Sequence, residues 1–243
     1  MGIGVFAFIR EHRADDTLDR NPNGCPNPNR LTMTQSNAIL GPQTVIAWDF
    51  DGVLNRNIVD GRFVWADRFE VDIGHSLDGF EKAIFRNNFD DVITGKVDLR
   101  NRLNEWARSV GYVGGVDALL EYWFENDALP DPEVGAVMDT LNDRGFRQVI
   151  VTNNESRRAT YIEGEMGFGE RVERVLSSGR MGVRKPAAAF FALVTETLEV
   201  EPGQMLLIDD CPKNIPAAIS SGWRAFHFTG DTRHELPLAL GLS

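Results

Sequence analysis

The chain of 243 residues has few cysteines, few lysines and no long apolar run. Only Cys25 and Cys211 are present, so no disulfide framework is expected. The longest apolar stretches fall far short of the ~18 residues that indicate a membrane span. Acidic residues outnumber basic ones by 36 to 25, giving a formal net charge of -11. This balance argues against binding to nucleic acid or to an anionic membrane, because both require a basic face.

We expect no targeting signal in the N-terminal part of the sequence. Residues 3–9 are apolar, but no basic segment precedes them and no small-residue cleavage site follows, so no signal peptide is predicted. Residues 1–43 are rich in turn formers and lack periodicity, which predicts a poorly ordered tail. We therefore expect a cytoplasmic protein. Its oligomeric state is unknown from the sequence.

One short stretch organises the rest of the chain. A β-branched and apolar run, residues 44–48, ends in Asp49 and Asp51, with one residue between the two acids and a glycine after them. At the carboxyl end of a strand, both acids would project into the crevice where open α/β sheets bind ligands. Adjacent carboxylates repel, so one keeps its proton unless a cation lies between them. By itself, the stretch is equally consistent with a strand followed by an acidic turn.

A helical pattern begins after residue 54 and continues for about seventy residues. Apolar residues recur at helical spacing around Phe80, Leu103 and Leu120. Asp98 and Gly111 fit the N-cap and the end of the middle helix. We therefore expect a small helical bundle, residues 56–128, inserted after the first strand.

From residue 129 onward, helical and strand patterns alternate. Helices are expected within 131–145, 155–166, 186–199 and 213–221, and strands at 146–151, 175–176, 205–208 and 225–228. This alternation predicts the α/β class, with a doubly wound parallel sheet and right-handed crossovers. The sheet domain would comprise residues 44–55 and 129–243.

Polar residues follow three of the expected strands. Asp49 and Asp51 follow the first, Thr152 ends the second, and Asp209 and Asp210 end a later one. Because the carboxyl ends of parallel strands share one edge of the sheet, these side chains should converge.

This set of residues fits phosphoryl transfer through an aspartyl-phosphate. Asp49 would be the nucleophile, and Asp51 would protonate the leaving alkoxide and then deprotonate the hydrolytic water. Asp49, the backbone carbonyl of Asp51 and Asp210 would bind Mg²⁺, which prefers oxygen ligands. Asp209 would either ligate the metal or support its site.

The phosphate side of the expected site is basic and polar. Lys185, one of only four lysines, would neutralise phosphate and carboxylate charge as a compact point charge. Thr152 and the following backbone amides would hold phosphate oxygens. Asn153 fits either a phosphate contact or a turn former, and Asn214 is expected to order the loop after Asp210. Arg56 is placed to meet a substrate if the insert closes there.

Four segments together resemble the ordered motifs of the haloacid dehalogenase (HAD) superfamily. They are Asp-Phe-Asp-Gly-Val-Leu at 49–54, Val-Thr-Asn-Asn at 151–154, Arg-Lys-Pro at 184–186 and Ile-Asp-Asp-Cys-Pro-Lys-Asn at 208–214. The insert resembles the helical cap of the subgroup containing haloacid dehalogenases, the phosphatase domain of soluble epoxide hydrolase and small sugar-phosphate phosphatases. The resemblance implies a Rossmann-like core, a mobile cap that gates the site, Mg²⁺ dependence and Asp210 as the principal metal-binding acid of its strand.

Within this superfamily, the presence of an acid at the position of Asp51 distinguishes phosphatases from dehalogenases. Dehalogenases with a similar cap lack this second acid, because a halide leaves without a proton. Asp51 therefore favours a phosphatase acting on a small phosphorylated metabolite. A phosphonatase would need a cap lysine, and we interpret Lys82 and Lys96 as surface residues. A phosphomutase, a dehalogenase and a non-catalytic phospho-binding module are the alternatives.

Overall fold

The structure is a computed structural model that describes residues 40–59 and 61–242. A five-stranded sheet lies at its centre, in the order β5-β4-β1-β6-β7. Its strands are β1 (Val45–Trp48), β4 (Arg147–Thr152), β5 (Arg174–Ser177), β6 (Met205–Asp209) and β7 (Arg224–His227). Every neighbouring pair is parallel. The predicted doubly wound parallel sheet is therefore confirmed. The prediction of a disordered tail falls almost entirely on residues 1–39, outside the described residues.

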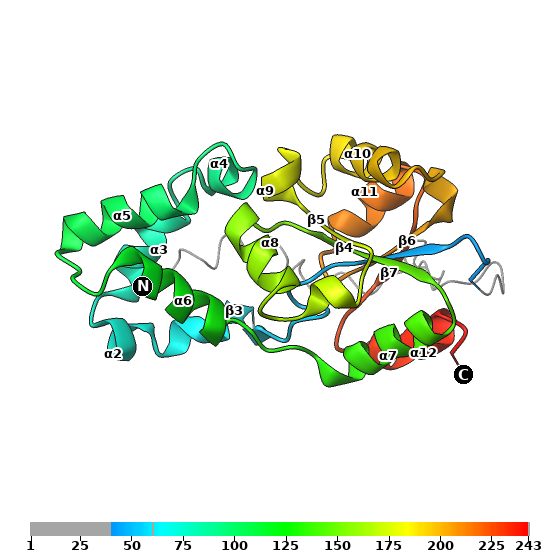
Figure 1. Cartoon of the computed structure of the whole chain (residues 1–243), viewed down its shortest axis with the longest axis horizontal. Coiled ribbons are helices and arrows are strands. Elements are labelled where there is room, and N and C mark those ends of the chain that lie inside the picture. The colour runs from blue at the N-terminus through cyan, green and yellow to red at the C-terminus, as the bar shows by residue number, and fades with distance from the viewer. Residues whose placement is uncertain (1–39, 60, 243) are drawn as a thin grey trace, which may run out of the picture.

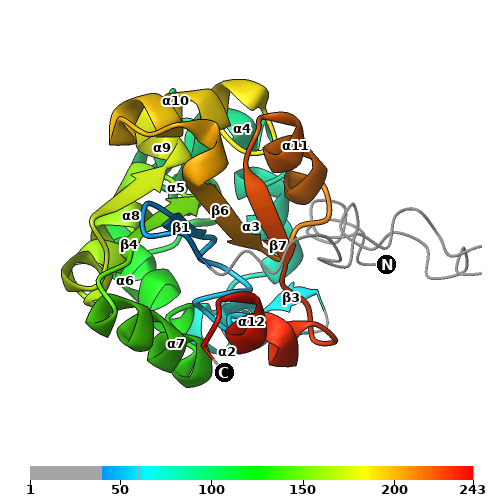
Figure 2. The ribbon, with the colours of Figure 1, turned by 90° about the vertical axis from the view of Figure 1, so that its right-hand side faces the viewer.

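Each face of the sheet buries its own apolar cluster, because successive strand side chains point to opposite faces. Ile46 and Trp48 pack with residues of α7 (Pro132–Asp143), α8 (Ser156–Glu163) and α12 (Leu236–Ala239). Val45 and Ala47 pack with residues of α10 (Ala188–Leu198) and α11 (Asn214–Ser220). Figure 2 shows α10 and α11 above the sheet and α7 and α12 below it. The apolar run before Asp49 is thus buried on both faces, as expected for a parallel sheet.

The insert forms a separate apolar cluster. Its helices are η1 (Val64–Asp67), α2 (Phe69–Ile73), α3 (Leu77–Ile84), α4 (Phe89–Ile93), α5 (Leu99–Val110) and α6 (Val116–Asn126). Fully buried Phe80 lies within this cluster, and its ring centroid is 4.6 Å from that of Phe69 and 4.9 Å from that of Trp106. Figure 1 shows these helices gathered at one end of the molecule and the sheet at the other.

The beginning of the insert is not helical, contrary to the prediction. Strands β2 (Ile58–Val59) and β3 (Arg62–Phe63) form an antiparallel hairpin. Two adjacent β-branched residues favour a strand, and Gly61, with φ of 73°, supplies a backbone conformation common in hairpin turns. The hairpin pattern is present in the sequence, but it spans only the six residues 58–63.

Capping explains where two predicted helices begin. Asp131 accepts hydrogen bonds from the amides of Glu133 (3.0 Å) and Val134 (3.1 Å) at the start of α7. Asp98 accepts one from the amide of Arg100 (2.8 Å) at the start of α5. Each carboxylate satisfies amides that would otherwise have no partner in the first turn.

Short helical turns connect the longer elements. They are η2 (Phe168–Glu170), α9 (Ser178–Met181), η3 (Pro202–Gln204) and η4 (Arg233–Glu235). None of the helices in the described part of the chain is long and apolar enough to cross a membrane.

Two linker segments join the insert to the sheet, the first at residues 55–57 and the second at residues 127–130, and they lie side by side. Asn55 and Pro130 form an isolated antiparallel bridge. The Asn55 side chain donates a hydrogen bond to the carbonyl of Asp127 (2.8 Å) and accepts one from the amide of Leu129 (2.7 Å). The predicted boundaries at 55–56 and 128–129 lie within these linkers, and the division into core and cap stays a prediction.

The C-terminal segment is attached to the start of α7 through Arg233. Its Nη2 atom donates to Asp131 Oδ1 at 2.7 Å and to Glu133 Oε2 at 2.8 Å. Burial alone would raise the pKa of Asp131, but hydrogen bonds from Arg233 and from the backbone of Val134 lower it below its ordinary value. A carboxyl with such a lowered pKa stabilises the fold above its unfolded pKa and loses this effect as the pH falls through its folded pKa.

We therefore expect Arg233→Gln to weaken the rise of unfolding free energy with pH between about pH 3 and 5, because the carboxyl loses its cation. Urea unfolding across this range measures the effect. Arg108→Gln, which changes an exposed arginine, is the matched control and should keep the wild-type slope. Equal slopes in the wild type and in Arg233→Gln would contradict this account of Asp131.

Candidate active site

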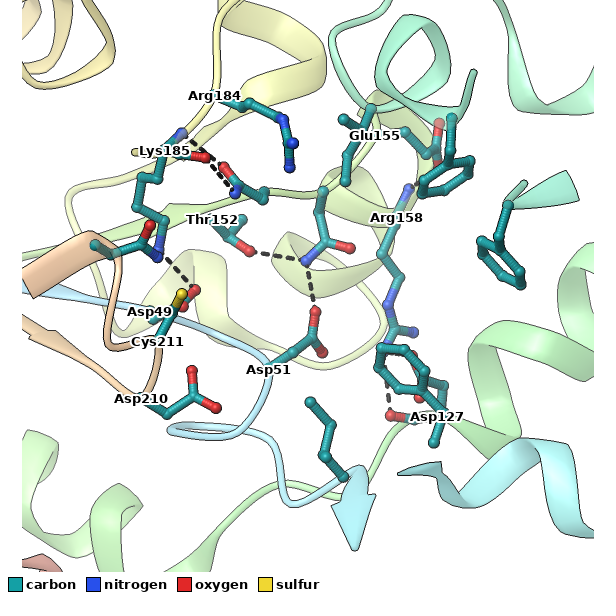
Figure 3. Close-up of a pocket in the computed structure, with 18 of the residues that line it drawn as sticks. Asp49, Asp51, Asp127, Thr152, Glu155, Arg158, Arg184, Lys185, Asp210 and Cys211 are labelled. Atoms are coloured by element: carbon teal, nitrogen blue, oxygen red, sulfur yellow. Dashed lines mark hydrogen bonds and ion pairs between the residues drawn. The ribbon is translucent and has the colours of Figure 1, made fainter. Parts of the chain in front are cut away.

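The carboxyl ends of β1, β4 and β6 open onto one cavity. Its volume is about 670 Å³, and the insert supplies its opposite wall. Figure 3 shows side chains from these strand ends and from the segment before α10 directed toward a shared space. Of the residues predicted for the site, those that line the cavity are Asp49, Asp51, Thr152, Asn153, Lys185 and Asp210. The structure thus brings together side chains that are up to about 160 positions apart in the sequence.

Lys185 joins carboxylates from two neighbouring strands. Its Nζ atom lies 3.0 Å from Asp49 Oδ1 and 2.6 Å from Asp209 Oδ2, and its side chain is only 1% exposed. Burial alone would lower the pKa of Lys185, but the charges of Asp209 and Asp49 raise it above its ordinary value. The amine therefore stays protonated and balances negative charge at the end of β1.

Asp209 has hydrogen-bond partners on both carboxylate oxygens. Oδ1 accepts from the amide of Cys211 (2.9 Å) and from Asn214 Nδ2 (2.9 Å), while Oδ2 accepts from Lys185 Nζ and from Asn214 Nδ2 (3.0 Å). The residue is fully buried. Asp209 therefore fixes Lys185 and the loop after β6, and Asn214 orders that loop as expected.

Three acids form a group with the dimensions of a metal site. One carboxylate oxygen each from Asp49, Asp209 and Asp210 lie within 4.8 Å of one another. Burial raises the pKa of Asp49 well above its ordinary value, and Asp209 and Asp210 raise it further, against the lowering effect of Lys185. Burial and the charge of Asp209 raise the pKa of Asp210 to about 7. A divalent cation would relieve this repulsion, and carboxylate oxygens suit Mg²⁺, so the residues fit such an ion.

Gly52 leaves the space that Asp210 occupies. A Cβ atom at this position would lie 2.4 Å from Asp210 Oδ2, and the backbone φ of 82° is one that other residues rarely adopt. The glycine of the first motif is therefore required for the approach of the loops after β1 and β6.

Asp51 is held by three side-chain amides. Its Oδ1 accepts from Asn57 Nδ2 at 2.8 Å and from Asn55 Nδ2 at 3.2 Å, and its Oδ2 accepts from Asn154 Nδ2 at 2.9 Å. Asn154 also donates to Thr152 Oγ1 at 2.8 Å. Figure 3 shows this connection between Asp51 and Thr152 as dashed lines. The orientation of the Asp51 carboxylate is therefore fixed from both the first linker and the end of β4.

A buried polar chain continues from Asp51 into the second linker, and sequence reasoning missed it. Asn57 Nδ2 also donates to Asp127 Oδ1 at 2.8 Å, and Arg158 Nη2 lies 3.0 Å from Asp127 Oδ2. Burial and the charge of Asp51 raise the pKa of Asp127, against the lowering effect of Arg158. No local pattern links Asn57 to a residue seventy positions away, so only the folded chain reveals the contact.

The remaining predicted residues take different positions. Thr152 is 1% exposed and lines the cavity at the end of β4. Asn153 accepts from the amide of Lys185 (2.9 Å) and donates to its carbonyl (2.9 Å), so it positions the lysine backbone. Arg56 is not brought to the site: its side chain is 61% exposed, and its Nε lies 3.9 Å from Asp131 Oδ2.

Comparisons with known proteins identify the family to which the chain is similar. Residues 43–222 match the haloacid dehalogenase-like hydrolase family. Phosphoglycolate phosphatase from Vibrio parahaemolyticus serotype O3:K6 is 25% identical over 201 residues, covering 80% of this chain and 87% of that protein. Phosphoglycolate phosphatase from Neisseria gonorrhoeae is 23% identical over 199 residues, covering 76% and 80%.

Solved structures share the fold. A HAD family enzyme from Bacteroides thetaiotaomicron, in complex with magnesium and inorganic phosphate, has a TM-score of 0.64 at 15% identity and covers 76% of this chain and 94% of its own. L-2-haloacid dehalogenase from Xanthobacter autotrophicus, with chloropropionic acid covalently bound, has a TM-score of 0.54 at 15% identity and covers 82% and 84%.

Removal of Lys185 should destabilise the protein strongly. We expect Lys185→Met to lower the unfolding free energy by about 3–5 kcal/mol near neutral pH, because two buried carboxylates lose their partner. The loss of unfolding free energy should shrink at lower pH. The two buried carboxylates of the folded variant then bind protons more readily than those of the unfolded chain, and proton binding stabilises the folded state. Denaturant unfolding at two pH values measures this. Lys82→Met, at an exposed lysine, is the control, and a loss in Lys185→Met that does not change with pH would contradict the expected charge balance.

Proposed function

The chain belongs to the haloacid dehalogenase-like hydrolases, and we propose that it is a Mg²⁺-dependent phosphatase acting on a small phosphate monoester. The observation that carries the proposal is the position of Asp51. Its carboxylate lines the same cavity as Asp49 and is fixed by three amide donors. A departing halide needs no proton, whereas an alkoxide does, so a positioned second acid favours phosphate ester hydrolysis over dehalogenation.

In the first step, Asp49 attacks phosphorus. Its Oδ1 accepts from the amide of Phe50 (2.7 Å) and lies 3.0 Å from Lys185 Nζ, which leaves Oδ2 available for the new bond. As the bond from this oxygen to phosphorus forms, the bond between phosphorus and the ester oxygen breaks. The ester oxygen keeps the electron pair and receives a proton from Asp51. The products are the free alcohol and an aspartyl-phosphate.

In the second step, water hydrolyses the aspartyl-phosphate. Asp51, now deprotonated, accepts a proton from water as the water oxygen bonds to phosphorus. The bond between phosphorus and Asp49 breaks, the carboxylate is regenerated, and inorganic phosphate leaves. Asp51 then holds the proton needed for the next cycle. It therefore alternates between proton donor and proton acceptor, and no further proton donor is required.

The other residues of the site offset charge and orient phosphate. The carboxylates of Asp49 and Asp210 and the backbone carbonyl of Asp51 would hold Mg²⁺, which supplies positive charge for the phosphate oxygens when bound. Asp209 would support this site rather than ligate the ion, because both its oxygens are occupied. The Thr152 hydroxyl and the amide after it would donate to phosphate.

The comparisons support the same reaction. Relatives over most of the chain are named phosphoglycolate phosphatases, and a protein with the same fold was solved with magnesium and inorganic phosphate. The proposed substrate is therefore a small phosphorylated metabolite. The proposed compartment is the cytoplasm, because a chain with only two cysteines does not need an oxidising environment.

Asp49→Asn should lower kcat/KM for phosphate release from 4-nitrophenyl phosphate by roughly 10³-fold or more, because a carboxamide does not provide the nucleophile. Colorimetric detection of phosphate measures the loss. Removal of Mg²⁺ with EDTA should abolish wild-type activity, and added Mg²⁺ should restore it. Asp139→Asn, on the exposed face of α7, is the matched control. Activity that survives Asp49→Asn would refute the nucleophile assignment, and an isomerised ester in place of free phosphate would indicate a mutase.

Asp51→Asn should have an effect that depends on the leaving group. With an alkyl phosphate, whose alkoxide must be protonated, the first step should slow by about 10²–10⁴-fold. With 4-nitrophenyl phosphate, whose phenolate leaves without a proton, the first step should persist while hydrolysis stalls. Rapid mixing should then show a burst of nitrophenolate of about one equivalent per enzyme. Equal losses for both esters, with no burst, would argue against Asp51 as the proton carrier.

A further inference from the structure

The cavity has two chemically different ends. The sheet end carries the acids and Lys185, whereas the insert supplies an aromatic wall formed by Phe63, Trp65, Phe85, Phe89, Trp123 and Phe124. A phosphate bound at the sheet end would direct its leaving group toward this wall. The chemistry of the wall therefore determines which leaving groups can bind.

The aromatic wall is continuous, and part of it faces the cavity. The ring centroid of Trp123 is 5.5 Å from that of Phe85 and 5.2 Å from that of Trp65, and Phe85 and Phe89 are 4.9 Å apart. Phe63, Phe85, Phe89 and Trp123 are only partly buried, although they pack against the apolar cluster of the insert. Rings that are held in place but not fully covered form a preorganised apolar surface, which is typical of a ligand pocket.

The described part of the insert presents no cation to the cavity. Among the described residues that line it, those between 56 and 128 include no Lys, Arg or His. The ionisable residue that this segment does contribute is Asp127, which is buried and paired with Arg158. Arg158 Nη1 also donates to the carbonyl of Phe124 at 2.9 Å. At the insert side of the cavity, a carboxylate on the leaving group would therefore lose its water and meet aromatic rings and another acid.

Two of the cations at the sheet side have carboxylate partners: Arg184 Nη2 lies 3.1 Å from Asp90 Oδ1, and Lys185 lies between Asp49 and Asp209. Lys213, which also lines the cavity, is exposed and lies after β6, on the side of the sheet and not on the aromatic wall. The volume of about 670 Å³ is within the range of pockets that hold drug-sized ligands. The charge and the size of the cavity thus both disfavour a short acid as the leaving group.

We infer that the preferred substrates are phosphate monoesters of uncharged, apolar alcohols that carry a ring. This inference rests on the proposed phosphatase function and deepens it by naming the class of leaving group. The proposed substrate class differs from the one in the printed names of the phosphoglycolate phosphatase relatives, because glycolate bears a carboxylate and the aromatic wall offers no cation to pair with it.

The test compares benzyl phosphate with 4-carboxybenzyl phosphate, using the full chain with Mg²⁺. The two esters differ by one remote charge, and the methylene group keeps their leaving oxygens chemically alike. We expect kcat/KM to be at least about tenfold higher for benzyl phosphate, since a buried unpaired charge is strongly disfavoured. Phosphoglycolate should be a poorer substrate than benzyl phosphate by a similar or larger factor.

Variants of the aromatic wall test whether its residues cause the preference between the two esters. Trp123→Ala should reduce the preference for benzyl phosphate, whereas Tyr122→Ala, which removes the adjacent aromatic residue that does not line the cavity, should preserve the wild-type ratio. Phe85→Lys should shift the ratio toward 4-carboxybenzyl phosphate, because it places a cation at the partly exposed edge of the wall. The wild-type ratio alone decides the question if either variant fails to fold.

The outcomes separate the two proposals. Efficient hydrolysis of 4-carboxybenzyl phosphate or phosphoglycolate in preference to benzyl phosphate would overturn the inference and leave the phosphatase function standing. Loss of that preference in Arg184→Gln would identify Arg184 as a carboxylate contact. Absence of Mg²⁺-dependent phosphate release from every ester, 4-nitrophenyl phosphate included, would overturn the proposed function and the inference with it.

Discussion

The contact on which the site depends is the buried ammonium group of Lys185 between two carboxylates. The register that pairs Trp48 with Ile208 brings the acids after β1 and within β6 side by side, where they would repel without a cation. Lys185 balances part of that charge, and Asn153 holds its backbone from the end of β4. Three strand ends are thus fixed relative to one another. Asp210 adds negative charge that Lys185 does not balance, and this is why the site fits a metal ion.

Asp51 depends on a second network, which originates in the linkers. Its amide donors include Asn55 and Asn57 from the first linker, and Asn57 in turn contacts Asp127 in the second. The two linkers are hydrogen-bonded to each other, so they form one unit beneath the insert. A rotation of the insert that separated Asn57 from Asp127 would also change the donors around Asp51. The position of the insert and the orientation of the proposed proton carrier are therefore physically linked.

Sequence reasoning predicted the elements with strong local patterns and the residues at the strand ends, but it missed contacts that form only in the folded chain. The β-branched run before Asp49 and the cap at Asp131 are local patterns, and they predicted β1 and the start of α7. Arg56 was expected to meet substrate, if the insert closes there, because it lies just past the first motif. In the extended linker, however, successive side chains face opposite sides, so Asn55 and Asn57 point inward while Arg56 is exposed. The partner of Asn57 lies seventy positions away, beyond the reach of any local pattern.

The aromatic wall and the charged strand ends reinforce each other physically. Rings such as Phe85 and Trp123 line the cavity on the side opposite the strand ends, where they make the medium less polar, and a less polar medium strengthens the interaction of Lys185 with nearby negative charge. The same medium makes a second negative charge on the leaving group costly, because no cation from the described part of the insert lines the cavity. A wall that favours phosphate chemistry at one end therefore disfavours a carboxylate at the other. The proposed catalysis and the proposed selectivity for an apolar leaving group would thus have a common physical cause in this cavity.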